Sequence, residues 1–230
     1  MLAKDVMTEN VISVSEESPI HEVVGLLLKY RISAVPVVDG ARKVVGIISE
    51  GDLLRPEGAS RTATQRPWWL EAVSAGQTVS YEKAHGRTAG AVMTRNVVTV
   101  DADTPLNEIA RLLEHHHIKR VPVLSDGRLA GIVSRANLLH GLANTIIDHH
   151  EPRAAQDRQL RNELVKILLN KRELDGALVN VTVTDGNARL WGVVENADDG
   201  TVVESAAKAL PGVKSVENNL HPGPISGVPV

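Results

Sequence analysis

Two short segments of the sequence each place two polar side chains three residues apart. Ser49 and Asp52 follow the apolar run at residues 44–48, and Ser134 and Asn137 follow a similar run at 129–133. On the first turn of a helix, residues with this spacing share one face. The hydroxyl and the helix N-terminus favour a phosphate, and a carboxylate can accept both hydroxyls of a ribose. The pattern therefore suggests nucleotide binding, and the structural alternative is a helix cap beside a solvated acid.

The two segments are not equivalent. Asn137 is uncharged and offers a single acceptor oxygen together with a donor amide, so it holds a ribose diol less well than a carboxylate does. We therefore predict that the site around Asp52 is the stronger one.

An internal repeat places these residues in corresponding positions. The stretch VMTENVISV begins at Val6 and VMTRNVVTV begins at Val92, and the match continues at the same offset to Pro36 and Pro122. After one deletion, GIISEGDLL at Gly46 pairs with GIVSRANLL further along the chain. The sequence therefore contains two copies of one supersecondary unit.

Each copy predicts the order β-α-β-β-α. In the first copy we expect a short strand at 11–14, a helix capped by Ser18 with Pro19 at its first position, strands at 33–39 and 44–49, and a short helix opened by Ser49. The helices leave apolar strand surface that the second copy can cover, so two copies form the smallest self-sufficient body.

The VMT opening, the segment SAVPVVD and the closing GIIS-x-x-D-L together resemble the CBS domain, named from cystathionine β-synthase. Two such domains in tandem form a Bateman module. The resemblance implies a regulatory module that binds adenine nucleotides or related adenosyl ligands in clefts between the repeats and performs no chemistry of its own.

Specific residues carry this expectation. Backbone groups of Ile12, Ser33 and Val35 are placed to read an adenine edge, and the resemblance implies that Lys119 and Arg120 reach the phosphates of a nucleotide held mainly by Asp52. The alternative for the basic pair is a solvated strand edge that discourages aggregation. The full predicted nucleotide-binding set is Ile12, Ser13, Ser33, Ala34, Val35, Pro36, Ser49, Asp52, Lys119, Arg120, Val121, Pro122, Ser134 and Asn137.

Three consecutive histidines, His115 to His117, raise the question of a metal site. Adjacent side chains on a helix point in different directions, so the three cannot bind one ion without unwinding the helix. We predict no metal site and a solvated helix end, where a histidine could face the phosphates.

Between the repeats, a segment rich in Arg and Thr precedes Pro67, after which Trp68 and Trp69 begin a predicted short helix. The two tryptophans could form a ligand-sensing lid, contribute to a dimer contact or pack on their own module.

The C-terminal segment predicts a second domain with the order α-β-β-α-β. It contains an amphipathic helix from Asp157, a hairpin around Asp185 and Gly186, a helix at about 198–210 and a final strand. The pattern V-x-V-x-D-G-x-x-x-L-x-G-x-V and the later PGV-x-x-V-x-NNL resemble the BON domain. Members are associated with envelope attachment and phospholipid contact, a role that a copy behind CBS repeats need not share.

Composition limits the function. The chain has 230 residues, a net charge of -3, 2% aromatic residues and no cysteine. It therefore lacks the basic surplus and the stacking aromatics of a nucleic-acid binder, and it cannot form disulfides. We see no apolar signal peptide and no membrane span, and we expect a cytoplasmic protein. No nucleophile–base pair or phosphate-cradling glycine loop is evident, so we predict no catalytic residues and no enzyme.

Together these features predict an α/β (α+β) protein with two CBS repeats packed as a pseudo-symmetric module and a small BON domain. The predicted boundaries are 1–60 and 91–147 for the repeats, 61–90 for the insert, 148–156 for a linker, 157–222 for the BON domain and 223–230 for a tail. We expect a homodimer that requires no cofactor, binds an adenine nucleotide as a regulatory ligand and signals through the BON domain to an unknown partner. The alternatives are a constitutive dimerisation scaffold with empty clefts and a phospholipid-associated adaptor.

Overall fold

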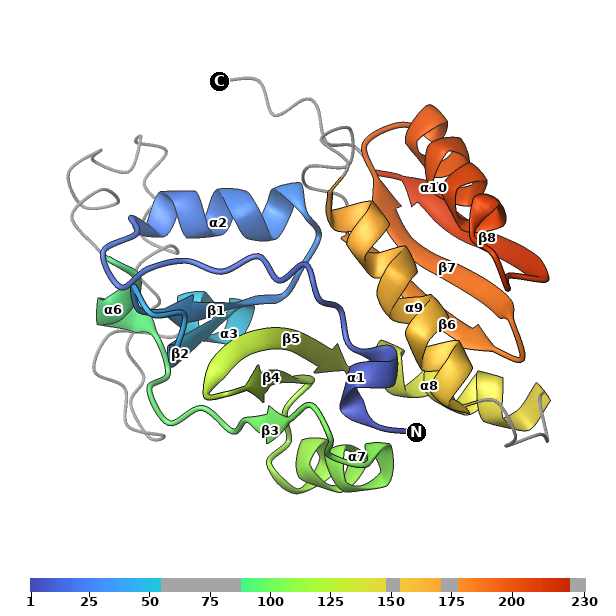
Figure 1. The fold of residues 1–230 in the computed structure, drawn as a ribbon. Helices are drawn as coiled ribbons and strands as arrows, with labels where there is room; N and C mark the ends of the chain where they lie inside the picture. Colours follow the sequence, from blue (N-terminus) through green and yellow to red (C-terminus); the bar gives the residue numbers. More distant parts are fainter. Residues whose placement is uncertain (55–87, 148–153, 171–177, 224–230) are drawn as a thin grey trace. The chain divides into compact units, whose positions relative to one another are not determined.

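The computed structural model describes residues 1–54, 88–147, 154–170 and 178–223, and these residues form two units (Figure 1). One unit contains the described residues between Ile12 and Val97, and the other combines residues 1–11 with those from Val98 onward. Helices and strands alternate in both units, which confirms the α/β (α+β) class. The predicted helix after Pro67, with Trp68 and Trp69, lies outside the described residues.

The first unit is built on the first repeat. Its elements are α2 (Ile20–Lys29), β1 (Ala34–Val38), β2 (Val44–Ser49), α3 (Glu50–Leu54) and α6 (Ala89–Val92). Strands β1 and β2 pair in antiparallel fashion, and side chains from α2 pack on them to form an aliphatic core. This core fits a sequence that contains no phenylalanine.

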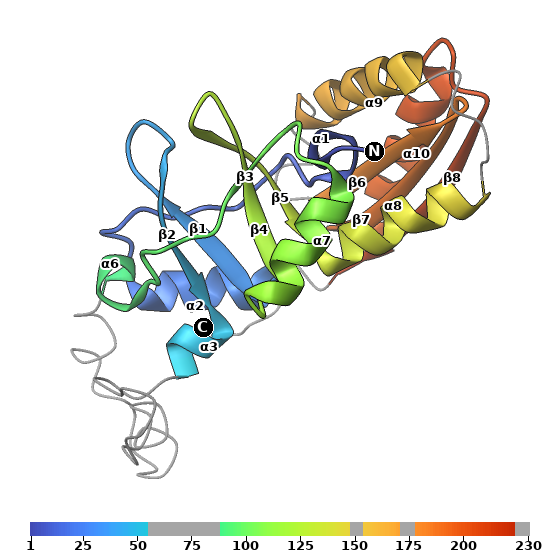
Figure 2. The same cartoon turned by 90° about the horizontal axis from the view of Figure 1, so that it is seen from below.

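The second repeat has the same plan with a longer sheet. Its elements are β3 (Val100–Asp101), α7 (Leu106–His115), β4 (Arg120–Ser125), β5 (Arg128–Ser134) and α8 (Arg135–Ile147). Helix α1 (Ala3–Val6), from the opening of the first repeat, belongs to the same unit. The strand order is β3-β4-β5, with β3 parallel and β5 antiparallel to β4. Helices α7 and α8 run beside these strands (Figure 2).

The opening segment of each repeat packs on the other copy's sequence. Backbone hydrogen bonds of 3.0 Å join Thr8 to Ile132 in both directions, and bonds of 3.0 and 2.9 Å join Thr94 to Ile47. The preceding methionines lie against glycines of the last strand of each copy. A Cβ added at Gly131 would lie 2.4 Å from the sulfur of Met7.

At Gly46 an added Cβ would lie 2.2 Å from the sulfur of Met93. A real Cβ does not approach another atom this closely, so any larger residue at either position would force the methionine side chain to move. The methionine of each VMT motif therefore packs against the glycine of the GIIS or GIVS motif in the other copy, and the chain makes this contact twice. This explains why both motifs are repeated.

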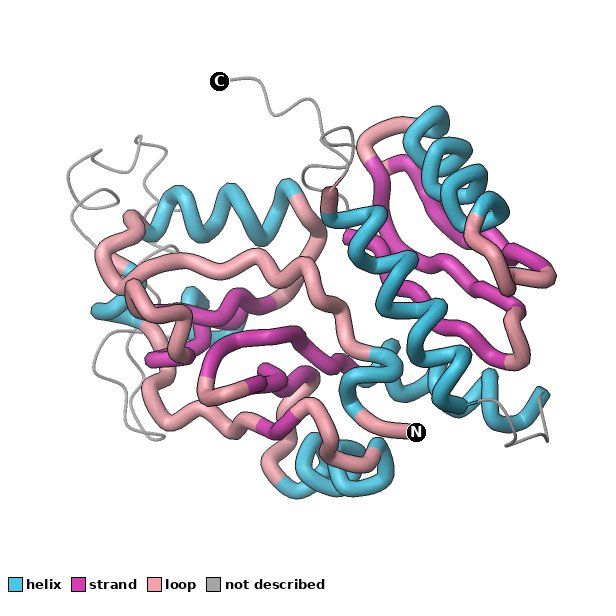
Figure 3. The backbone as a smooth tube through the Cα atoms, in the orientation of Figure 1, coloured by secondary structure: helices cyan, strands magenta, loops and turns pink. Residues whose placement is uncertain are grey.

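The C-terminal domain contains α9 (Ala154–Leu169), β6 (Leu178–Thr184), β7 (Asn187–Val194), α10 (Ala197–Ala209) and β8 (Ser215–Pro222). The sheet order is β6-β7-β8, and both helices contribute to one core against it (Figure 3). The predicted hairpin is present, with positive φ angles of 52° at Asp185 and 77° at Gly186. These angles fit a two-residue turn between twisted strands.

Asp157 holds this hairpin turn. Its carboxylate is 9% exposed and accepts hydrogen bonds from the backbone N–H groups of Asp185 at 2.8 Å and Gly186 at 2.9 Å. Within the described part of the chain, no helix has the length and apolar character needed to cross a membrane.

Several predicted details were wrong. The strand expected at 11–14 is reduced to one parallel bridge between Val14 and Val37, because the Val11 N–H is used in a local bond to the Glu9 carbonyl. Pro19, rather than Ser18, is the N-cap of α2.

The Ser18 hydroxyl does not cap α2 because it accepts a hydrogen bond from the backbone N–H of Ser15 at 3.1 Å. The helix expected from Asp157 begins three residues earlier, because α9 starts at Ala154.

Candidate functional site

Ser49 and Asp52 form a reciprocal cap at the start of α3. The backbone N–H of Ser49 donates to Asp52 Oδ2 at 2.8 Å, the Ser49 hydroxyl donates to the same oxygen, and the Asp52 N–H donates back to the hydroxyl at 3.4 Å. The capping alternative considered for this pair is therefore realised. The cap fixes the orientation of a half-buried carboxylate.

Thr94 is a third member of this group that the sequence did not identify. Its hydroxyl donates to Asp52 Oδ1 at 3.0 Å. The residue belongs to the repeated VMT opening, and it reaches Asp52 because that opening packs on β2. In the sequence, the only sign of a role for Thr94 is that the threonine occurs in both copies of the VMT motif. The pairing of Thr94 with Ile47 then brings it to Asp52.

The register of β1 and β2 brings the other first-repeat residues to the same end of the strands. Ala34 lies opposite Ser49, and the Glu50 N–H donates to the Ser33 carbonyl at 3.1 Å. The bridge at Val14 continues the sheet beside β1, and Ile12 and Ser13 lead into it. Val35 and Pro36 are buried in the core, so they shape the strand and present no exposed side chain.

The second repeat reproduces this arrangement on β4 and β5. Arg120 lies opposite Ser134, and the Arg135 N–H donates to the Lys119 carbonyl at 3.1 Å. Lys119 is exposed and Arg120 is half-buried, whereas the core positions Val121 and Pro122 are buried.

Asn137 differs sharply from its counterpart Asp52. It is 3% exposed, and its oxygen accepts from the backbone N–H and the hydroxyl of Ser134. Its amide donates to the Val6 carbonyl at 2.8 Å and lies 3.5 Å from the Thr8 hydroxyl. Both ends of the amide are therefore engaged within the protein, and the two sites are chemically unequal.

The consecutive histidines are exposed at the end of α7, where the rings of His115 and His116 meet edge to face at 4.9 Å. The described residues contain no group of three His, Asp or Glu side chains arranged to hold a metal ion.

Comparisons with known proteins identify the domains. The sequence matches the CBS domain family over residues 3–56 and 89–144 and the BON domain family over residues 156–224. The fold and the paired sites thus define a tandem CBS-domain protein. The chain belongs to this family and carries a BON domain at its C-terminal side.

Two relatives show the extent of the likeness. Protein MJ1426 of Methanocaldococcus jannaschii is 31% identical over 162 residues, which cover 62% of this chain and 91% of that protein. The chloroplastic CBS domain-containing protein CBSX2 of Arabidopsis thaliana is 29% identical over 144 residues, covering 59% of this chain and 60% of CBSX2. The chain thus matches less than two thirds of CBSX2.

Solved structures of CBSX2 match as well. Its crystal structure as a CBS-pair protein is 26% identical, covers 64% of this chain and 97% of that one, and aligns with a TM-score of 0.52. A second structure shows CBSX2 in complex with AMP, with 27% identity and a TM-score of 0.48, covering 62% of this chain and 96% of that one.

Proposed function

We propose that this chain is a non-enzymatic regulatory protein whose CBS pair binds an adenine nucleotide at the first repeat. The observation that carries the proposal is the Asp52 carboxylate, oriented by Ser49 on one oxygen and by Thr94 on the other. A carboxylate that is already held in place binds a ribose diol without first losing side-chain freedom. The serine and threonine hydroxyls beside it can interact with the rest of the ligand.

The remaining predicted contacts belong to the same proposal. Ala34 lies opposite Ser49, and the Ser33 carbonyl accepts from the Glu50 N–H. In our proposal the backbone groups of Ile12, Ser33 and Val35 bind the adenine edge. Lys119 and Arg120 remain candidates for the phosphates. Replacing both with alanine is expected to weaken binding of ATP more than binding of adenosine.

An adenosyl ligand is further supported by CBSX2, a relative by sequence that has been crystallised with AMP. Adenine nucleotides are therefore the first ligands to test, together with S-adenosylmethionine. In our proposal nucleotide binding changes the conformation of the CBS pair, and this change alters what the BON domain can contact. A ligand shifts such a conformational equilibrium only if it binds the two conformations with different affinities.

We also propose that the protein is a homodimer. Leu139 and Leu142 lie three residues apart on α8 and are 65% and 54% exposed. Two leucines on one helix face favour contact with another apolar surface. The occupant to which we commit is a second copy of the chain, as in a dimer of modules.

Isothermal titration calorimetry of the full chain with AMP, ADP, ATP and S-adenosylmethionine tests the proposal. The key variant is Asp52→Asn, which keeps the shape of the side chain and copies the residue of the second repeat. Asp126→Asn is the matched control, because it removes the same charge from an exposed turn between β4 and β5. We expect binding that Asp52→Asn weakens and Asp126→Asn leaves intact. If none of these ligands binds, or if both variants bind equally well, the proposal is wrong.

A further inference from the structure

In both units a threonine of a VMT opening lies beside the Asp or Asn of a Ser-x-x-Asp/Asn motif. The two units differ in which group donates the hydrogen bond. In the first unit the hydroxyl of Thr94, from the opening of the second repeat, donates to Asp52 of the first repeat. In the second repeat Asn137 supplies a donor near Thr8, and the Thr8 hydroxyl donates outward to Asn180 Oδ1 at 2.9 Å. Asn180 is a residue of β6 in the BON domain.

The residues beside Thr8 are also bound by the BON domain. Arg161 on α9 has a side chain that is only 3% exposed and forms an ion pair with Glu9 at 2.7 Å. The same guanidinium donates to the Met7 carbonyl and to the Val181 carbonyl, each at 2.9 Å. A buried arginine satisfied in this way ties the BON sheet to the opening segment of the chain.

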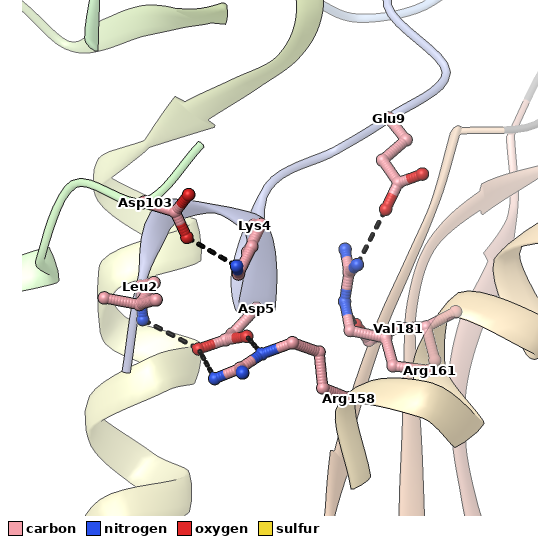
Figure 4. A network of polar contacts seen from close by, with 8 residues as sticks. All are labelled: Leu2, Lys4, Asp5, Glu9, Asp103, Arg158, Arg161 and Val181. Atoms are coloured by element: carbon pink, nitrogen blue, oxygen red, sulfur yellow. Dashed lines mark hydrogen bonds and ion pairs between the residues drawn. The ribbon is translucent and has the colours of Figure 1, made fainter. Parts of the chain in front are cut away.

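Two further contacts continue this interface. Arg158, one helical turn before Arg161, pairs with Asp5 at 2.7 Å, and Asp5 also accepts from the Leu2 N–H (Figure 4). On another part of the interface, the ring of Trp191 on β7 stacks on His140 of α8 at 4.1 Å. Three parts of the second repeat's unit therefore contact the BON domain: α1 through Asp5, the segment after it, and α8 through His140.

We infer that the Thr8–Asn137 position of the second repeat is a docking site for the protein's own BON domain, used in place of a ligand. At the position that corresponds to Thr94, the Thr8 hydroxyl is bound by Asn180, and Arg161 binds the neighbouring residues Met7 and Glu9. The neutral residue at 137 fits this role, because its amide donates to the Val6 carbonyl and a carboxylate there would repel that oxygen.

The inference goes beyond nucleotide binding and holds whether or not Asp52 binds a ligand. It has a consequence for each case. If a nucleotide binds, it binds at the first repeat alone, so that one molecule binds per chain. In either case, loosening the docked BON domain exposes Trp191.

The test uses the full chain with Trp68→Phe and Trp69→Phe, which leave Trp191 as the single tryptophan reporter. Docking is disrupted by Glu9→Lys with Arg158→Glu, which place like charges against Arg161 and Asp5. The matched control is Glu16→Lys with Lys208→Glu, which makes the same charge changes at ion pairs with Arg95 and Glu204, away from the BON docking contacts. Circular dichroism checks that all variants are folded.

In the disrupted variant we expect a red shift of the Trp191 emission and a rise of about twofold or more in its acrylamide quenching constant, because the indole leaves a packed contact. The control should match the parent. Unchanged quenching in a folded disrupted variant would overturn the inference, and so would two nucleotides per wild-type chain. If the double variant does not fold, Thr8→Val with Thr94→Val as its control gives the same comparison. A lack of nucleotide binding would count against the proposed function only.

Discussion

The contact between the repeated methionine and the repeated glycine predicts a large difference between two Gly→Ala substitutions in the same unit. Gly46→Ala would bring a methyl group to 2.2 Å from the sulfur and 2.8 Å from Cγ of Met93. Overpacking of this kind costs about 1–3 kcal/mol, and the more restricted unfolded chain returns about 0.5–1 kcal/mol. We expect a net loss of about 1–2 kcal/mol in the free energy of unfolding.

Gly25→Ala is the control. Gly25 lies within α2, is exposed and has no atom within 4 Å of an added Cβ. Alanine in an open helix position stabilises by about 0.5–1 kcal/mol, so this variant should melt at a higher temperature than the parent. The two substitutions should therefore have opposite signs.

Thermal melting and hydrogen exchange of peptides from residues 34–49 measure the effect and its location. For a protein of this size the loss at Gly46→Ala corresponds to about 2–8 °C in Tm. In a Met93→Ala background the clash is absent, so Gly46→Ala should cost little there, with a coupling of about 1 kcal/mol or more. The packing explanation of the repeat would be refuted if Gly46→Ala were as stable as Gly25→Ala. It would also be refuted if the free-energy losses of Gly46→Ala and Met93→Ala were additive in the double variant.

Three further predictions concern other parts of the chain. Asp157→Ala leaves two hairpin N–H groups without their acceptor and should destabilise the BON domain by about 2–4 kcal/mol, measured by urea unfolding, with Asp157→Asn intermediate. Burial lowers the pKa of His140, so the state with the BON domain docked disfavours the protonated imidazole. Docking of the BON domain should therefore be complete above the ordinary pKa of 6.5 and should weaken as the pH falls below it. Trp191 emission against pH measures this, and His140→Gln should flatten the curve. Leu139→Glu with Leu142→Glu should convert the dimer to a monomer in light scattering; a wild-type monomer would contradict the dimer.

The repeat made much of the fold predictable. The offset between VMTENVISV and VMTRNVVTV, the apolar stripe of α2 and the hairpin signal at Asp185 and Gly186 predicted the type of most elements in both repeats and the BON domain, but not the short helices α1 and α6 or the loss of the strand at 11–14. These are local patterns, and local patterns determine element type well. Errors arose at boundaries, as at Ser18, where a side chain had two possible hydrogen-bond partners.

Long-range partners could not be predicted in the same way. A threonine in a VMT motif gives no local sign that it will donate to Asp52 or to Asn180. Arg161 appears in the sequence as a polar position of an amphipathic helix, yet its side chain is buried because Glu9 and two carbonyls bind it. The difference between Asp52 and Asn137 was predicted from their chemistry, but its use for docking became apparent only from the three-dimensional contacts.

The central claim is that the chain binds one adenine nucleotide, at the site that contains Asp52. The most direct measurement is a calorimetric titration of the wild-type full chain and Asp52→Asn with the nucleotide that binds best. Replacing a charged acceptor with a neutral one should weaken the affinity at least about tenfold. The account predicts one molecule bound per wild-type chain and this loss in the variant. Two molecules per chain, or an Asp52→Asn variant with wild-type affinity, would contradict it.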